Sequence, residues 1–295
     1  MTMLLLRAIH RYTQRHADAT GVAETPVRGL HLVQASAPTG LEHTIVKPLV
    51  CLVVQGAKRV VIADREHTYQ ANDSMIVTTN APTVSRISQA SVSKPYLAVA
   101  LELETAVIAD LNTAMTGMVE PGEHTDGEID VNLSEALLRL VKLLDRPGDL
   151  AVLGHTLVRE IHYWLLLGKH GRAIRELGLP DSQVRRISRA ISLLRKRYAV
   201  PLSIQQLAAE AGMGRSAFHK HFLAVTSLTP LQFQKQLRLI EARRQMLEQG
   251  KTASRAAFDV GYQSVSQFSR EYARLFGRPP MADRSAIRRE TAIEN

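Results

Sequence analysis

The sequence predicts an α+β protein of two domains: an N-terminal β-barrel with flanking helices, and a C-terminal all-α domain with two helix-turn-helix motifs. Three observations lead to this prediction. The chain of 295 residues exceeds the roughly 100–200 residues of one typical domain, its hydrophobic pattern changes from short strand-like runs to helical periodicity, and one motif occurs twice near its end. We place the domains at residues 1–178 and 179–295.

The composition is that of a folded globular protein, with 45% hydrophobic and 22% charged residues. The first apolar run, MTMLLLRAIHRY, is interrupted at Arg7 and is too short for a signal peptide or a membrane span. We therefore expect it to begin a helix, in a cytoplasmic protein without membrane contact. The single cysteine, Cys51, excludes an internal disulfide, and its place in the apolar run LVCLVV favours a buried hydrophobic role.

The positive charge is concentrated at one end of the chain. The net charge is +9, but the residues from Asp181 onward hold 20 Lys and Arg against 9 Asp and Glu, whereas the preceding residues hold 17 against 19. This asymmetry suggests that one domain contacts a polyanion such as double-stranded DNA and the other does not.

Five short runs rich in β-branched and aliphatic residues lie between about Gly29 and Glu104. They are LHLVQAS, LVCLVVQG, KRVVIAD, SMIVTTN and YLAVALELE, and turn-forming stretches such as APTG, GAK, ANDS and NAP separate them. Strands at a spacing of roughly ten residues predict a barrel or jelly roll, a closed sheet whose mouth can hold a small ligand.

Helical periodicity follows the strand region. A second apolar helix is expected from about Val152 to Leu167, after a first one with a regular apolar stripe. The stripe consists of Leu133, Leu137, Leu140, Val141 and Leu144. Such a stripe serves equally well as core or as the seam of a dimer.

Catalytic or metal-binding residues are not expected in the barrel. A metal-dependent barrel enzyme needs clustered histidine and carboxylate ligands on its strands, but His31, His43 and His67 are scattered singly. We therefore expect no metal, no cofactor and no catalytic residue, and interpret the barrel as a sensor whose effector-binding residues are unknown.

One motif occurs twice in the C-terminal part. Its copies are PLSIQQLAAEAGMGRSAFHKHF and TASRAAFDVGYQSVSQFSREY, and they align with an offset of 49 to 50 residues. Gly212 matches Gly261, and Phe218 matches Phe268. Each copy reads as an amphipathic helix, a glycine that ends it in a tight turn, and a second helix, which is the plan of a helix-turn-helix.

Capping residues mark the helix starts. Ser203 with Gln206, and Ser264 with Gln267, have the spacing of a capping box, in which two side chains satisfy the free N–H groups of the first turn. The linking segment TPLQFQKQLRLIEARRQMLEQG has Thr229 as N-cap and is expected to form one helix that closes at Gly250. Its length of about 30 Å is close to the ~34 Å between successive major-groove faces on one side of B-DNA.

The His-x-His pair at His219 and His221 does not form a metal site. Helical residues two apart point about 200° away from each other, whereas chelating pairs on a helix are four apart. Phe218 and Phe222 are expected to be buried, which leaves an exposed face suited to the major groove. Its candidate DNA-binding residues are Ser216, His219 and Lys220.

The second copy presents a similar face. Phe268, Tyr272 and Leu275 form its expected buried stripe. Arginine can read guanine, glutamine can read adenine, and serine bonds to bases or phosphates. The candidate DNA-binding residues of this copy are Ser264, Ser266, Gln267, Ser269 and Arg270.

At these residues the sequence resembles the AraC/XylS family of bacterial transcription regulators. The resemblance covers residues 183–284, and GYQSVSQFSREYARLFGRPP looks like the family signature. The N-terminal part resembles the cupin-like sensor domain of an AraC-type subgroup through Gln55-Gly56-x-Lys58 and Lys94-Pro95-Tyr96-Leu97. The resemblance implies a homodimeric cytoplasmic regulator whose sensor binds a small-molecule effector and thereby changes the recruitment of RNA polymerase. An activator is the expected class, but whether transcription rises or falls stays open.

Two other functions stay open at the level of sequence. One is a cupin-type small-molecule enzyme that the tandem motif tethers to DNA. The other is a DNA-binding regulator that needs no effector. The leading prediction is a sequence-specific DNA-binding transcription regulator, with phosphate contacts from the basic side chains of residues 181–295.

Overall fold

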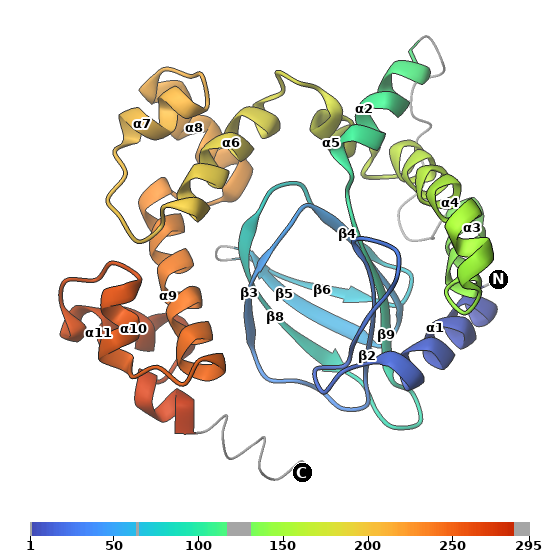
Figure 1. Ribbon diagram of the computed structural model, residues 1–295, viewed down its shortest axis with the longest axis horizontal. Helices are drawn as coiled ribbons and strands as arrows, with labels where there is room; N and C mark the ends of the chain where they lie inside the picture. Colours follow the sequence, from blue (N-terminus) through green and yellow to red (C-terminus); the bar gives the residue numbers. More distant parts are fainter. Residues whose placement is uncertain (1, 63–64, 117–130, 286–295) are drawn as a thin grey trace. The chain divides into compact units, whose positions relative to one another are not determined.

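The computed structural model describes residues 2–62, 65–116 and 131–285 (Figure 1). The chain divides into two compact units: the first ends at Arg185, and the second begins at Arg186 and also includes the short segment His43–Ile45. The predicted α+β organisation is confirmed, because strands occupy the first unit and the second is helical. The domain boundary between residues 178 and 179 stays a prediction.

The strands of the N-terminal unit form two sheets. The five-stranded sheet has the order β1-β2-β9-β4-β7, and the four-stranded sheet has the order β3-β8-β5-β6. The strands are β1 (Val22–Glu24), β2 (Leu30–Ala35), β3 (Glu42–Val46), β4 (Leu49–Gln55), β5 (Ala57–Ile62), β6 (Arg65–Gln70), β7 (Ser74–Val77), β8 (Ala81–Gln89) and β9 (Tyr96–Glu102).

All five predicted strands are present, as β2, β4, β5, β7 and β9, and four more were missed. Strands β3 (EHTIV) and β6 (REHTYQ) are rich in polar residues and lack a clear apolar alternation. Strand β8 directs small and hydroxyl-bearing residues such as Thr83 and Ser85 inward, so its buried positions do not read as hydrophobic. Burial on the inner faces of both sheets creates one shared core, which includes Cys51, Val60 and Tyr96.

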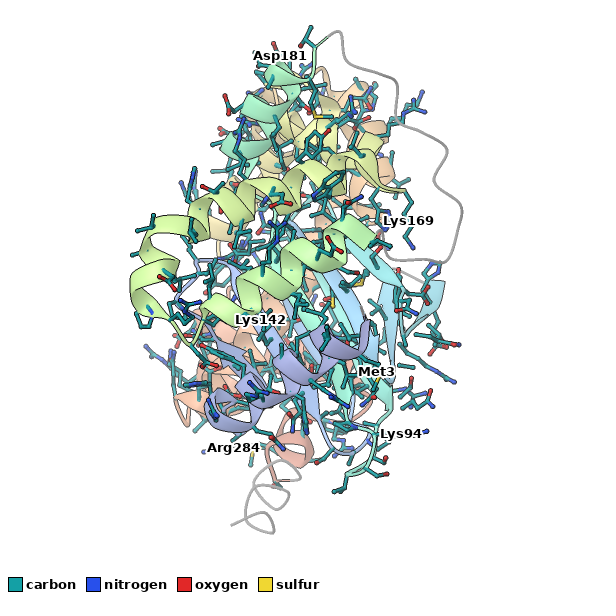
Figure 2. All side chains as sticks on the ribbon, turned by 90° about the vertical axis from the view of Figure 1, so that its right-hand side faces the viewer. Met3, Lys94, Lys142, Lys169, Asp181 and Arg284 are labelled. Carbon is teal, nitrogen blue, oxygen red and sulfur yellow. The ribbon has the colours of Figure 1, made fainter. Side chains whose placement is uncertain are left out.

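Helices α1 (Thr2–His16), α3 (Val131–Leu143) and α4 (Pro147–Leu167) cover the outer face of the five-stranded sheet. Helices α2 (Thr105–Ala114) and α5 (Gly171–Gly178) pack against each other and against α4. In Figure 2 the helices that carry Met3 and Lys142 lie in front of the strands. The predicted leucine stripe is buried, and Leu133 and Leu137 face Val99 and Leu101 of β9 across a narrow gap. The stripe is therefore core within one chain.

The C-terminal unit is helical. Its helices are α6 (Gln183–Lys196), which spans the division, α7 (Ile204–Glu210), α8 (Arg215–Thr226), α9 (Pro230–Glu248), α10 (Ala253–Asp259) and α11 (Val265–Phe276). Within the part of the chain that the structure describes, no helix combines the length and the apolar composition that a membrane span requires.

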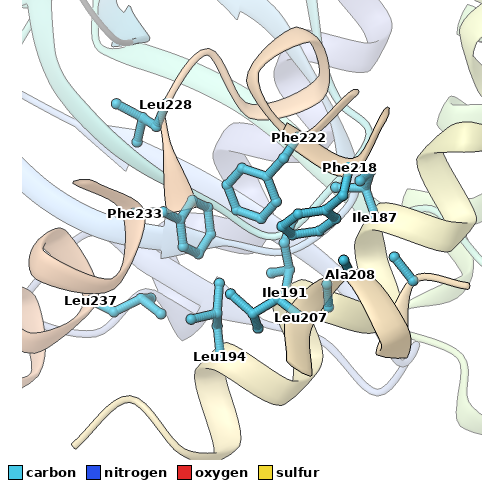
Figure 3. Packing of buried hydrophobic residues seen from close by; sticks show 12 residues of the cluster. Ile187, Ile191, Leu194, Leu207, Ala208, Phe218, Phe222, Leu228, Phe233 and Leu237 are labelled. Atoms are coloured by element: carbon cyan, nitrogen blue, oxygen red, sulfur yellow. The ribbon is translucent and has the colours of Figure 1, made fainter. Parts of the chain in front are cut away.

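Two hydrophobic clusters support this unit, one for each copy of the repeated motif. In the first, the rings of Phe218, Phe222 and Phe233 pack against Ile191 and Leu207 (Figure 3). The second cluster is built in the same way around Phe268 and Tyr272. Helix α9 contributes to both clusters, so one continuous helix joins the two motifs.

Candidate nucleic-acid interface

The two predicted helix-turn-helix motifs are confirmed, and their turns have the same geometry. The backbone N–H of Met213 donates to the carbonyl of Ala208, and that of Tyr262 donates to the carbonyl of Ala257, both at 2.9 Å. Gly212 has a φ of 63° and Gly261 a φ of 91°, a left-handed conformation that glycine adopts without steric cost. The alignment of the two copies therefore extends from sequence to backbone geometry.

The predicted caps are confirmed with one correction. Ser203 with Gln206, and Thr229 with Gln232, form complete capping boxes. Ser264 accepts a hydrogen bond from the backbone N–H of Gln267, but the reciprocal bond is missing. The Gln267 side chain instead donates to Glu271 at 3.2 Å, one turn further along α11. The expected capping box at the start of α11 is thus only half formed.

Helix α8 divides into a buried and an exposed face as predicted. Phe218 and Phe222 are fully buried with ring centroids 5.4 Å apart. Ser216, His219 and Lys220 are exposed on the other side. The structure therefore brings the three candidate residues of the first copy together on one open helical face, while their contact with DNA stays a prediction.

Helix α11 repeats this arrangement. Phe268 and Tyr272 are fully buried, also with ring centroids 5.4 Å apart. The candidate residues Ser264, Ser266, Gln267 and Arg270 are exposed, and Ser269 is partly buried. The face of the second copy thus holds more of the candidate residues than that of the first, with one cation, Arg270 or Lys220, in each.

Two exposed arginines extend these faces and were missed in the sequence. Arg215 is the first residue of α8. Arg274 lies four residues after Arg270 and seven after Gln267, which places it on the same face of α11. The same helical periodicity, continued beyond the first two turns of α11, predicts that Arg274 is exposed.

A central junction fixes the two motifs relative to each other within the C-terminal unit. It consists of Tyr198, Ala199, Gln234, Arg238 and Gly261. The guanidinium of Arg238, on α9, donates to the carbonyl of Tyr198 at 2.7 Å and to that of Gly261 at 3.2 Å, and Gln234 also donates to the carbonyl of Tyr198. Because Gly261 belongs to the second turn, the segment after α6, the linking helix and the second motif form one hydrogen-bonded block.

Not every basic side chain of this unit is available to a polyanion. Arg186 donates to the carbonyls of Ala211 and Gly212 and thereby covers the first turn. Arg238 serves the central junction, and Arg243 forms an ion pair with the buried Asp283. The basic residues of this unit therefore fall into two groups: those that form hydrogen bonds or ion pairs within the fold, and those that are exposed.

The core between the sheets of the N-terminal unit contains a small polar cluster. Lys58 lies on the same side of β5 as the buried Val60 and pairs with Tyr69 across the strands. Cys51 and Tyr96 belong to the same buried cluster, and burial raises the pKa of both. Lys58 is close enough to Cys51 to lower that pKa slightly by its charge. Among the described residues, no carboxylate forms an ion pair with Lys58.

The segments of the N-terminal unit that carry the family resemblance also meet in space. The side-chain amide of Gln55 donates to the carbonyl of Pro95 at 2.7 Å. Gly56 has a φ of 81°, and a Cβ at this position would overlap the carbonyl of Gln89. The turn between β4 and β5 therefore requires glycine at position 56, and Gln55 links it to the segment at Pro95.

The family description "AraC-type transcriptional regulator N-terminus" matches residues 26–173, half of the chain. The chain belongs to this family. A helix-turn-helix domain description matches residues 207–286, which include both recognition-type helices. The AraC-type resemblance predicted from the sequence is thereby confirmed.

Known regulators are similar to this AraC-type chain over part of their length. The transcriptional regulator ArgR of Pseudomonas aeruginosa is 26% identical over 109 residues, 37% of this chain and 33% of ArgR. The virulence regulon transcriptional activator VirF of Yersinia enterocolitica is 25% identical over 153 residues, 50% of this chain and 54% of VirF. The chain thus spans a third to about half of the length of these relatives.

The fold of the AraC-type chain is similar to that of ToxT from Vibrio cholerae. An apo ToxT structure has a TM-score of 0.51 at 12% identity and covers 88% of this chain and 98% of ToxT. A wild-type ToxT structure with a bound unsaturated fatty acid has the same TM-score at 11% identity, and covers 85% of this chain and 92% of ToxT. At this identity the likeness concerns the fold alone.

Proposed function

We propose that this chain is a sequence-specific DNA-binding transcription regulator whose activity a small-molecule effector controls. One observation carries the proposal: two recognition-type helices, each with a buried aromatic pair and an exposed polar face, stand at the ends of a single linking helix. Helix α9 has 19 residues and is therefore about 28 Å long. This length suits two helices that enter major grooves about 34 Å apart on one side of a duplex.

Different side chains on these faces are expected to supply affinity for DNA and preference for one sequence. Lys220, Arg215 and Arg274 are exposed cations that suit phosphate contacts, which hold the protein on any sequence. Arg270 lies one turn from the start of α11, where a side chain can reach base edges, and its guanidinium suits bidentate bonds to guanine. Arg270 is therefore the residue on which we expect sequence preference to depend most.

Substitution of Arg270 by alanine tests this function. We expect the affinity for the cognate duplex to fall by about 1–3 kcal/mol, which is about 5–150-fold, with little change on random DNA. Fluorescence anisotropy on both duplexes measures the two affinities. The control is Lys142→Ala, which removes one exposed positive charge from α3 in the other unit. An equal loss on both duplexes would reduce Arg270 to a phosphate contact.

The polar cluster between the sheets supports an effector with an anionic group. Lys58 is a half-buried cation without an ion-pair partner among the described residues, and it lies opposite Tyr69 on the neighbouring strand. A cation in apolar surroundings gains most from an anionic partner that enters with it. The unsaturated fatty acid bound to ToxT is also a carboxylate, which agrees with this choice of effector chemistry.

A thermal-shift comparison of small carboxylates with amides of the same size tests the effector proposal. A carboxylate that binds the folded state should raise the melting temperature, whereas its amide should not. The variant Lys58→Met should lose this response, and Lys94→Met, at an exposed turn, should keep it. If acid and amide act alike, or if Lys58→Met responds as the wild type does, the assignment of Lys58 is wrong.

The remaining parts of the proposal rest on the family resemblance. They are a homodimer, a location in the cytoplasm, RNA polymerase as the partner that is recruited, and the absence of catalysis. Sedimentation of the purified protein measures the first of these, and a monomer both with and without DNA would contradict it. Transcription in a purified system with RNA polymerase measures the recruitment.

A further inference from the structure

A pocket of about 400 Å³ lies on the helical side of the N-terminal unit. It opens between the loop Pro26–Arg28, the residue Glu104 before α2, Leu144 directly after α3, and the first half of α4. Its lining shares no residue with the polar cluster between the sheets. Its volume falls within the ~300–1,000 Å³ of typical small-molecule sites. The pocket is thus large enough for a small metabolite and separate from the interior of the sheets.

The lining combines apolar walls with a rim of opposite charges. Among the lining residues, Leu144 and Val158 are buried and Val27 is half-buried, so they form apolar walls. Arg28 and Glu104 are exposed at the rim. Among the described residues, neither Arg28 nor Glu104 forms an ion pair, although both line this pocket. The backbone N–H of Glu102 donates to the carbonyl of Gly29, which brings the two chain segments together just beside them.

The rim presents a cation and an anion that do not satisfy each other. His155 of α4 also lines the pocket, and its ring nitrogens can donate or accept a hydrogen bond. A ligand with only a carboxylate would leave Glu104 unpaired or repelled, and a ligand with only an amine would do the same for Arg28. The charge pattern therefore selects a molecule that carries both groups, and the walls select an apolar body.

We propose that this pocket binds an α-amino acid with an apolar side chain. The Arg28 guanidinium takes the carboxylate in a charge-assisted hydrogen bond, with His155 beside it, and Glu104 takes the ammonium group. The side chain of the ligand lies against Val27, Leu144 and Val158. The site is a second effector site, and its role in control rests on the function proposed above.

A buried histidine, His162, links two segments of the pocket lining. His162 of α4 is fully buried, its Nε2 accepts a hydrogen bond from the backbone N–H of Glu104 at 3.1 Å, and its Nδ1 lies 2.8 Å from the carbonyl of Val158. Because Nε2 accepts from an N–H, the proton of the neutral ring is on Nδ1, which donates to Val158, and burial lowers the pKa of His162 in favour of this neutral form. Glu104 and Val158 both line the pocket. A ligand that moves Glu104 therefore acts on the contact between the end of β9 and α4, and can favour one arrangement of the unit over another.

Calorimetric titration of the full-length protein tests the site. The probes are L-leucine, L-methionine, L-phenylalanine and L-tryptophan, each compared with its decarboxylated amine and its deaminated acid. At least one amino acid should bind, and its amine and acid should each bind about tenfold more weakly or worse, because each leaves one charged group without its partner. If no amino acid binds, or if an acid binds as tightly as its amino acid, the proposal is overturned.

Variants locate the binding. Arg28→Gln and Glu104→Gln should each weaken the amino acid about tenfold or more, since each removes one charged partner. Ala151→Trp should block binding by filling the pocket from an exposed position on α4 without touching the charges of the rim. Lys142→Gln, on the exposed face of α3, should leave binding unchanged. Binding that survives Ala151→Trp would place the ligand elsewhere and overturn the assignment.

DNA binding of the same preparation separates the two proposals. Amino-acid binding without sequence-specific DNA binding would remove the proposed function and leave the pocket assignment intact. Specific DNA binding without any amino-acid binding would remove the pocket assignment alone.

Discussion

Replacement of Gly261 by alanine should unfold the second helix-turn-helix motif or displace it from the first. Gly261 has a φ of 91°, and a Cβ there would overlap the carbonyl oxygen of Ala199 in the central junction. The left-handed backbone costs about 1–3 kcal/mol, and overpacking against a fixed carbonyl adds a similar amount. We expect a loss of about 3 kcal/mol or more in the free energy of unfolding of the C-terminal unit, with loss of specific DNA binding.

Gly214 provides the matched control for this substitution. It precedes α8, has a φ of −66°, and its Cβ would meet no described atom within 4 Å. Gly214→Ala should therefore cost less than about 1 kcal/mol, as an exchange at an exposed N-cap does. Urea unfolding and anisotropy on DNA measure both variants. Equal effects of the two substitutions would show that the junction does not constrain the second turn.

Substitution of Asp283 by alanine should destabilise the C-terminal unit by about 3–5 kcal/mol, because it leaves a largely buried arginine without its partner. Asp283 is buried, with 4% of its surface exposed. Its carboxylate accepts a hydrogen bond from Arg243 at 2.8 Å and another from the hydroxyl of Tyr272 at 2.7 Å. These bonds join the end of the described chain to α9 and α11. Thermal unfolding of the purified protein measures the loss. Glu248→Ala removes an exposed partner of Arg244 and should leave the melting temperature nearly unchanged.

This network also predicts the direction of a pH dependence. Burial alone would raise the pKa of Asp283, but the hydrogen bonds from Arg243 and Tyr272 and the charge of Arg243 together lower it. Because the pKa is lower in the folded than in the unfolded state, the stabilisation is fully present above the unfolded value of about 4. It is lost as the pH falls through the lower folded value. Asp283→Ala should therefore flatten the acid limb of the stability curve, and an unchanged limb would contradict the role of this carboxylate.

The features predicted from the sequence are those that neighbouring residues determine. The glycine turns at Gly212 and Gly261 and the capping box at Ser203 depend on positions a few residues apart, so a linear pattern contains them. The buried aromatic pairs follow from helical spacing in the same way. Most of the exposed residues of α8 and α11 could therefore be predicted, although Arg215 and Arg274 were missed and Ser269 is partly buried.

What the sequence did not reveal depends on contacts between distant segments. Arg238 donates to a carbonyl 40 residues before it and to another 23 residues after it, and no local pattern marks such an arginine as structural. Gln267 has the spacing of a capping residue, but its side chain bonds to Glu271 and not to the backbone N–H of Ser264. The pocket at Glu104 and His155 brings together segments that are far apart in the chain, and its residues show no motif.

The most direct test of the account is the affinity of the wild-type protein for duplex DNA from upstream of its own gene and for a scrambled duplex, measured by anisotropy across a salt series. Exposed cations on both recognition helices predict tight, strongly salt-dependent binding, and their polar faces predict a preference of about 10³ or more for the upstream duplex. The amino-acid and carboxylate effectors are included in parallel titrations. Equal, weak binding to both duplexes under every condition would contradict a sequence-specific regulator.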